Sequence, residues 1–186
     1  MVQRYFCLVG GPVPPLVMTM HSGMLMRDQF CTERSHMHRI LFVCHGNICR
    51  STMAQSVMTE LVRRAGLAAE FEIDSAATSR EEIGNPPHHG TARKLQEVGV
   101  PLVPHRARQI RADELGHWDV IAYMDGENLR GLKRIFGSEA LEQGTQTGQI
   151  CPLLPDRNVA DPWYTGDFDA TYRDVLEGCK RLINEL

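Results

Sequence analysis

The chain of 186 residues has no hydrophobic run long enough to span a membrane and no large excess of either charge. A membrane-spanning helix needs about 18 consecutive apolar residues, and no such run occurs. With a formal net charge of −3, the chain lacks the basic surplus that favours nucleic acids or anionic membranes. We therefore expect neither a nucleic acid nor a membrane as a partner.

Cysteine is present, but not in the patterns that build structural sites. Six cysteines do not make a disulfide framework in a chain of this length. No paired Cys or His spacing indicates zinc, and no Gly-Lys-Ser/Thr follows a glycine as in nucleotide-binding phosphate loops. These absences predict no bound metal.

The strongest functional signal is the segment 43–51, which reads VCHGNICRS. It follows the apolar run 40–43, which is typical of a buried strand, and it precedes a helical pattern that opens at Ser51. Cys44 is thus expected at a strand end, in a short loop that closes with Arg50 at a helix N-terminus. This arrangement favours a phosphate-binding loop with a thiolate inside it.

Each residue type in the loop suits that chemistry. Backbone N–H groups of a tight loop and a helix start converge on phosphate oxygens. Gly46 allows close approach of the backbone, Asn47 tolerates left-handed dihedrals, and Arg50 grips two oxygens with one planar fork. The same field favours the Cys44 thiolate, to which Ser51 can donate a hydrogen bond. The predicted phosphate loop around Cys44 and Arg50 comprises His45, Gly46, Asn47, Ile48, Cys49 and Ser51.

A thiolate that attacks phosphorus must expel an alkoxide or phenoxide, which needs a proton from a general acid. Asp161 is the best candidate, because it precedes a stiffening Pro162 in a loop before the last helix. Trp163 and Tyr164 are expected to form apolar walls of the substrate cleft and to shield Asp161 from water. Taken alone, Asp-Pro also signals a turn or a helix start.

Together, segment 43–51 and Asp161-Pro162 resemble the low-molecular-weight protein tyrosine phosphatases. The resemblance runs from about residue 37 to 186, through the motifs DSA (74–76), GNPP (84–87), HRARQ (105–109) and DVIAYMD (119–125). It implies hydrolysis of phosphotyrosine in protein substrates through a cysteinyl-phosphate, with no metal and no organic cofactor. It also implies that Cys44 is the nucleophile, that Arg50 binds phosphate, and that Asp161 serves as acid and then as base.

The chain departs from this family in a few places. Thr52 stands where the family usually has Pro, and Gln55 replaces a common Glu. The loop 78–82 lacks the aromatic residue that often forms one wall of the substrate cleft. The pair 88–89, two histidines, could partly replace it, although solvated residues at a helix start are the simpler interpretation.

Cys49 shares the loop with Cys44, and family members often carry a second cysteine there. It is therefore a candidate redox partner that shields Cys44 from over-oxidation through a reversible disulfide. The alternative is a small buried residue in a tight loop. Because the thiolate mechanism requires a reduced Cys44, we expect a cytoplasmic protein.

Two regions differ in character along the chain. Residues 1–36 carry Pro, Gly and Met without a sustained period, and we interpret them as a poorly ordered N-terminal extension. Residues 37–186 form the predicted phosphatase domain, an α/β fold. Its four-stranded parallel sheet, in order 2-1-3-4 with helices on both faces, places the phosphate loop after strand one. Strands are expected near 39–44, 71–75, 119–124 and 149–152, and helices near 51–66, 88–99, 125–136 and 167–185, with a helical turn near 112–116.

Three other functions fit such a fold. Arsenate reduction needs extra cysteines near the catalytic loop, usually after the second strand, and residues 50–150 contain none. A protein-arginine phosphatase usually has a smaller polar residue in place of Ile48, whose bulk suits an aryl ring better. A catalytically dead phosphate-binding module is disfavoured by the intact Cys44, Arg50 and Asp161.

Overall fold

The computed structural model describes residues 37–186, so the extension predicted for residues 1–36 lies outside the described residues. The strands are β1 (His38–Cys44), β2 (Phe71–Ala77), β3 (Val120–Tyr123) and β4 (Ile150–Pro152). The helices are α1 (Arg50–Arg64), α2 (His89–Glu97), α3 (Gly126–Phe136), α4 (Ser138–Thr147), α5 (Pro162–Thr165) and α6 (Phe168–Glu185), with 3₁₀ turns at Ala68–Glu70 and Ala112–Glu114.

The four strands form one parallel sheet in the order β2-β1-β3-β4, which confirms the predicted topology. β1 is an inner strand, paired with β2 on one side and β3 on the other. Cys44, its last residue, lies opposite Ala77 at the end of β2. The loop that follows therefore opens at the carboxyl edge of the sheet, where ligands bind in folds of this type.

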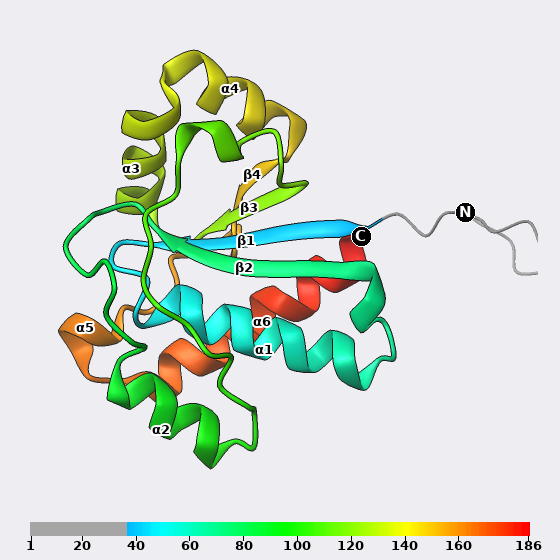
Figure 1. Cartoon of the computed structure of the whole chain (residues 1–186), viewed down its shortest axis with the longest axis vertical. Coiled ribbons are helices and arrows are strands. Elements are labelled where there is room, and N and C mark those ends of the chain that lie inside the picture. Colours follow the sequence, from blue (N-terminus) through cyan, green and yellow to red (C-terminus); the bar gives the residue numbers. More distant parts are fainter. Residues whose placement is uncertain (1–36) are drawn as a thin grey trace, which may run out of the picture. The chain divides into compact units, whose positions relative to one another are not determined.

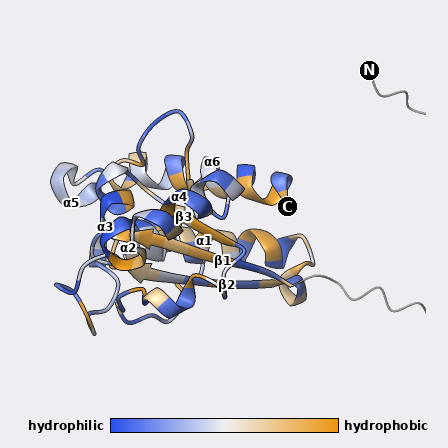
Figure 2. Cartoon of the chain, turned by 90° about the horizontal axis from the view of Figure 1, so that it is seen from above, coloured by the Kyte–Doolittle hydropathy of each residue, from blue (hydrophilic) through white to orange (hydrophobic). Residues whose placement is uncertain are grey.

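The side chains of β1 explain the layered arrangement. Successive residues of a strand point to opposite faces. Ile40 and Phe42 join a core cluster with α1 and α6, whereas Leu41 and Val43 join a second cluster with α3. Figure 1 shows α1 and α6 on one face of the sheet and α3 and α4 on the other. A strand buried on both faces has a continuous apolar run, and β1 and β3 are accordingly coloured mainly as hydrophobic in Figure 2, whereas the edge strand β2 is mixed.

Two helices were not predicted. The interval between α3 and β4 contains α4, which begins after Gly137 and ends before Gly148, both with positive φ. Asp161 does not lie in a simple loop, because its side chain caps the short helix α5. Within residues 37–186, no helix combines the length and apolar character needed to cross a bilayer.

Candidate active site

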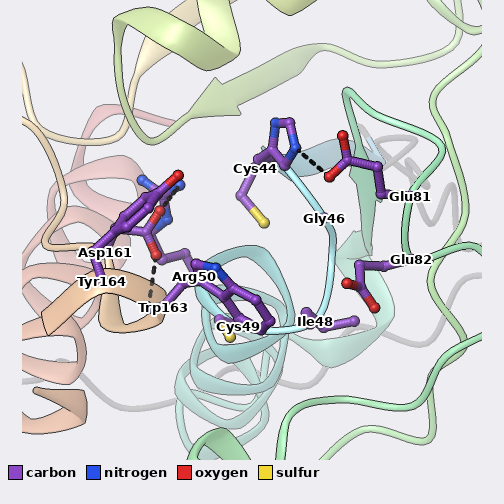
Figure 3. Close-up of a pocket in the computed structure, with 11 residues that line it drawn as sticks. Cys44, Gly46, Ile48, Cys49, Arg50, Glu81, Glu82, Asp161, Trp163 and Tyr164 are labelled. Atoms are coloured by element: carbon purple, nitrogen blue, oxygen red, sulfur yellow. Dashed lines mark hydrogen bonds and ion pairs between the residues drawn. The ribbon is translucent and has the colours of Figure 1, made fainter. Parts of the chain in front are cut away.

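Most of the sequence-predicted residues meet in one pocket at the carboxyl edge of the sheet, while Asn47 and Ser51 are fully buried and do not line it. Figure 3 shows Cys44 at the end of β1 and Arg50 at the start of α1 facing Asp161, which caps α5. Trp163 and Tyr164 line the same pocket beside Asp161, and the loop after β2 contributes a further wall. The complete lining is Cys44, His45, Gly46, Ile48, Cys49, Arg50, Glu81, Glu82, Asp161, Trp163 and Tyr164.

Asn47 fixes the shape of the loop through its side-chain amide. It is a non-glycine residue with positive φ, at 58°, as the sequence predicted. Its Nδ2 donates to Ser51 Oγ and Ser75 Oγ, each at 2.9 Å. Its Oδ1 accepts from the backbone N–H of Arg108 at 3.1 Å and contacts His105 Nε2 at 2.7 Å. The amide thus fills all four of its hydrogen-bonding positions, so the conformation of the loop is strongly specified.

The Cys44 sulfur is held by two donors. Its Sγ lies 3.1 Å from Ser51 Oγ and accepts from the backbone N–H of Asn47 at 3.3 Å. Because Ser51 Oγ already accepts from Asn47, its single hydrogen is free to point at the sulfur. Cys44 Sγ is thus positioned by the loop backbone and by Ser51.

Gly46 leaves space for the Glu82 side chain and does not adopt an unusual dihedral. Its φ is not positive, and a Cβ at this position would lie 3.0 Å from Glu82 Cγ. Thr52 stands where the family usually has proline, and its hydroxyl donates a hydrogen bond to the carbonyl of Cys49 at 3.0 Å. This hydrogen bond joins the loop to the first turn of α1. The helix start is therefore held in place without the proline.

Arg50 is buried and lies between two carboxylates. Its Nη1 contacts Asp125 Oδ2 at 2.5 Å, and its Nη2 contacts Asp161 Oδ2 at 2.6 Å. Burial opposes the charge on Arg50, but Cys44, Asp161 and Asp125 outweigh it and raise the pKa above its ordinary value. A permanently charged guanidinium therefore faces the pocket with its planar fork already oriented.

Asp161 is anchored by backbone contacts as well as by Arg50. Its Oδ1 accepts from the N–H of Trp163 at 3.0 Å, as the cap of α5. Trp163 and Tyr164 are 61% and 85% exposed, so they shield Asp161 less than the sequence analysis expected. Their rings instead border the mouth of the pocket, where an aryl group entering the site would contact them.

The wall opposite the aromatic side is polar. Glu81 and Glu82 lie there, and Glu81 Oε2 is 3.0 Å from His45 Nε2 (Figure 3). His88, predicted to be a solvated residue, is half-buried, stacks on Phe168 and meets Trp163 edge-on. Desolvation by burial and the nearby His89 lower the pKa of His88. His88 thus packs against Trp163 in the aromatic wall. It does not replace the aromatic residue that is absent from loop 78–82.

Cys49 is the second loop cysteine and is also buried. Burial, reinforced by Cys44 and Asp161, raises the pKa of its thiol to about 12. Cys49 therefore stays protonated at neutral pH, whereas Cys44 Sγ accepts a hydrogen bond from the loop backbone. Cys49 is suited to a secondary role rather than to attack on a substrate.

Several site residues received no role in the sequence analysis. They are Asp125, which orients Arg50, and the members of the Asn47 network, namely Gln55, Ser75, His105 and Arg108. Ser75 and Asp125 lie near the carboxyl ends of the strands that flank β1. Their position was therefore a usable signal, because these ends converge on the ligand edge of a parallel sheet.

Known proteins match this fold and this loop. The family model described as low molecular weight phosphotyrosine protein phosphatase matches residues 39–186. The low molecular weight protein-tyrosine-phosphatase YfkJ of Bacillus subtilis is 35% identical over 147 residues, or 77% of this chain and 92% of the relative. The crystal structure of YfkJ aligns with a TM-score of 0.72 over 82% of this chain and 96% of that chain.

Two further relatives extend the comparison. The low molecular weight phosphotyrosine protein phosphatase of Homo sapiens is 33% identical over 150 residues, covering 78% of this chain and 94% of the relative. The structure of a Drosophila arginine phosphatase aligns with a TM-score of 0.66 at 29% identity, over 78% of this chain and 96% of that chain.

These relatives define the class, which is that of the cysteine-dependent protein phosphatases. Within this class, the chain belongs to the low molecular weight phosphotyrosine protein phosphatase family. The family membership confirms the resemblance and the fold that the sequence predicted.

Proposed function

We propose that the protein hydrolyses phosphotyrosine in protein substrates in two steps, through a phosphorylated Cys44. The observation that carries this proposal is the meeting of Cys44, Arg50 and Asp161 in one pocket. A nucleophile, a phosphate-binding fork and a proton donor are the three groups that such a displacement requires. The aromatic wall at the pocket mouth suits the ring of a tyrosyl substrate.

In the first step, the phosphate group binds the loop amides and Arg50. Its oxygens compete with Asp161 for Arg50 Nη2, and the contact with Asp125 keeps the fork oriented. The Cys44 thiolate attacks phosphorus, the bond from phosphorus to the phenolic oxygen breaks, and Asp161 gives its proton to that oxygen. Phosphate binding thus releases Asp161 from Arg50, and Asp161 is then free to donate its proton.

In the second step, water attacks the phosphorus of cysteinyl-phosphate. Asp161, now a carboxylate, takes a proton from the water, the bond from sulfur to phosphorus breaks, and inorganic phosphate leaves. The departing thiolate is stabilised by the hydroxyl of Ser51 and the N–H of Asn47. The same donors therefore serve Cys44 as nucleophile and as leaving group.

The proton donor is tested by Asp161→Asn, which keeps the shape of the side chain but cannot release a proton. We expect kcat for phenyl phosphate to fall by about 10²- to 10⁴-fold, the usual contribution of general acid catalysis. The deficit should shrink along a series of aryl phosphates as the phenol becomes more acidic, because a stable phenolate needs no proton. Steady-state kinetics across the series measures this trend.

Asp167→Asn is the matched control, since Asp167 caps α6 by accepting from Ala170 N–H and does not line the pocket. Its rates should follow those of the unmodified protein for every phenol. A deficit of Asp161→Asn that is equal for all phenols would move the acid role to another carboxylate of the pocket, with Glu81 and Glu82 examined first.

Phosphoarginine is the alternative substrate, and the likeness to an arginine phosphatase makes it worth measuring in parallel. Ile48 lines the pocket with an apolar side chain, which favours an aryl ring over a charged guanidinium. We therefore expect kcat/KM to be higher for phosphotyrosyl than for phosphoarginyl peptides of matched sequence. The reverse order would assign the protein to arginine dephosphorylation.

We also propose that Cys49 protects Cys44 in a reducing, cytoplasmic setting. Peroxide converts the Cys44 thiolate to a sulfenic acid, and Cys49 then attacks its sulfur, forming a disulfide and releasing water. Because burial raises the pKa of Cys49, only its small thiolate fraction attacks. Disulfide formation should therefore accelerate as pH rises from neutral to alkaline.

Mild peroxide should therefore inactivate the protein, and a thiol reductant should restore it. Mass spectrometry of digested protein should find Cys44 joined to Cys49. In Cys49→Ser the same treatment should cause permanent loss, with Cys44 as the sulfonic acid. Free Cys49 beside sulfonic Cys44 in the unmodified protein would refute the protective role.

A further inference from the structure

The segment that delivers Asp161 to the pocket, residues 155–161, is tied to the sheet on one side. The backbone N–H of Val159 donates to the carbonyl of Met124 at 2.9 Å, and the Val159 side chain is buried in the core. Met124 directly precedes Asp125, which orients Arg50. The Arg50 side of the site and the Asp161 side therefore share one anchor at the end of β3.

On the other side, α6 holds both backbone groups of Ala160, the residue immediately before Asp161. The N–H of Ala160 donates to Asp174 Oδ2 at 2.9 Å. The carbonyl of Ala160 accepts from Thr171 Oγ1, also at 2.9 Å. Thr171 and Asp174 are three residues apart, so they lie on the same face of the helix. One face of α6 thus holds the two successive peptide units on either side of the Ala160 Cα.

The hydroxyl of Thr171 is available for this contact. Thr171 Oγ1 also lies 3.1 Å from the carbonyl of Asp167, but a hydroxyl has only one hydrogen to donate. The Asp167 carbonyl already accepts the Thr171 backbone N–H. We therefore assign the hydroxyl hydrogen to the shorter contact, the one with the Ala160 carbonyl. Thr171 is fully buried, so no water competes for it.

Asp161 itself has little freedom left. The next residue, Pro162, is buried and begins α5 with a fixed φ. We propose that Thr171 and Asp174 are positioning residues for the proton donor, because they fix the two successive peptide units that lead into Asp161. This inference rests on the proposed role of Asp161, and it extends the functional machinery to α6, which does not touch the substrate.

The test uses Thr171→Val, which keeps the volume of the side chain and removes the hydroxyl. Displacing a catalytic group by a fraction of an ångström is expected to lower kcat for phenyl phosphate by roughly 10- to 100-fold. The deficit should shrink as the phenol becomes more acidic, as for Asp161→Asn. A merely structural role would lower the amount of folded enzyme and reduce all rates by one common factor. The slope of log kcat against the pKa of the leaving phenol does not depend on that factor.

Thr171→Ser restores the hydroxyl and should return the slope to that of the unmodified protein. Asp174→Ala, at a partly exposed position, provides a second test if the valine variant folds poorly, and it should show the same graded deficit. Glu177→Gln is the matched control. Glu177 and Asp174 both bind Arg157, but no hydrogen bond joins Glu177 to Ala160 in the described residues.

A double variant tests whether Thr171 acts through Asp161. In an Asp161→Asn background, Thr171→Val should add no further dependence on the phenol, because the donor is already lost. A graded deficit for Asp161→Asn together with a flat profile for Thr171→Val and Asp174→Ala would overturn this inference alone. A flat profile for Asp161→Asn would overturn the acid assignment and this inference with it.

Discussion

Cys44→Ser is expected to abolish phosphotyrosine hydrolysis while leaving the phosphate site intact. A serine hydroxyl does not ionise near neutral pH, so no nucleophile remains. Removing a covalent nucleophile costs on the order of 10⁶-fold in kcat in a well-studied enzyme, which places the variant near the detection limit. A serine Oγ can still accept from the Asn47 N–H and from Ser51, and the side-chain contacts of Asn47 and Arg50 do not involve the sulfur.

Phosphate binding should therefore persist, and titration calorimetry with inorganic phosphate can measure it. The affinity should equal or exceed that of the unmodified protein, because loss of the thiolate removes a negative charge that repels the phosphate dianion. Cys151→Ser is the matched control, since Cys151 lies on β4 outside the pocket. Substantial turnover by Cys44→Ser, with phosphate bound as before, would contradict the nucleophile assignment.

The sequence predicted the parts of the fold whose local pattern and tertiary role agree. The run that forms β1 is apolar because both faces of the strand are buried, so strand, layer and site follow from a few residues. α4 had no such pattern, because Gly144 is its one buried residue. A Cβ at Gly144 would lie 2.7 Å from the Ile150 side chain, so contact with β4, rather than an apolar stripe, sets this helix in place.

The same distinction holds within the site. Cys44, Arg50 and Asp161 could be predicted because phosphoryl transfer demands their chemistry, and two of them share one short loop. The supporting residues were harder to predict, since a serine, a histidine or a second aspartate is common anywhere in a chain, and only the position of Ser75 and Asp125 near strand ends was a usable signal. Ser75 and His105 acquire a role only when folding brings them to the amide of Asn47. Their contribution depends on contacts between distant segments, which no local spacing records.

Arg50→Lys is expected to be nearly as damaging as loss of the nucleophile, although the charge is conserved. The two Nη groups of Arg50 contact Asp125 and Asp161 at once, and the same fork matches two phosphate oxygens. A lysine presents a single Nζ, which cannot reproduce that planar geometry. An arginine that stabilises a transferring phosphoryl group contributes about 10³- to 10⁵-fold, so we expect a loss of this order in kcat/KM.

Two comparisons separate geometry from charge. Arg106→Lys is the matched control, because Arg106 is exposed and donates to the carbonyl of Gly84 outside the pocket. Its kinetics should resemble those of the unmodified protein. Asp125→Asn keeps Arg50 but weakens the contact that orients it, so its loss in kcat/KM should be smaller than that of Arg50→Lys. Near-normal kcat/KM in Arg50→Lys would show that a point charge suffices, and the paired contacts of the Arg50 fork would then serve the fold rather than the transferred phosphate.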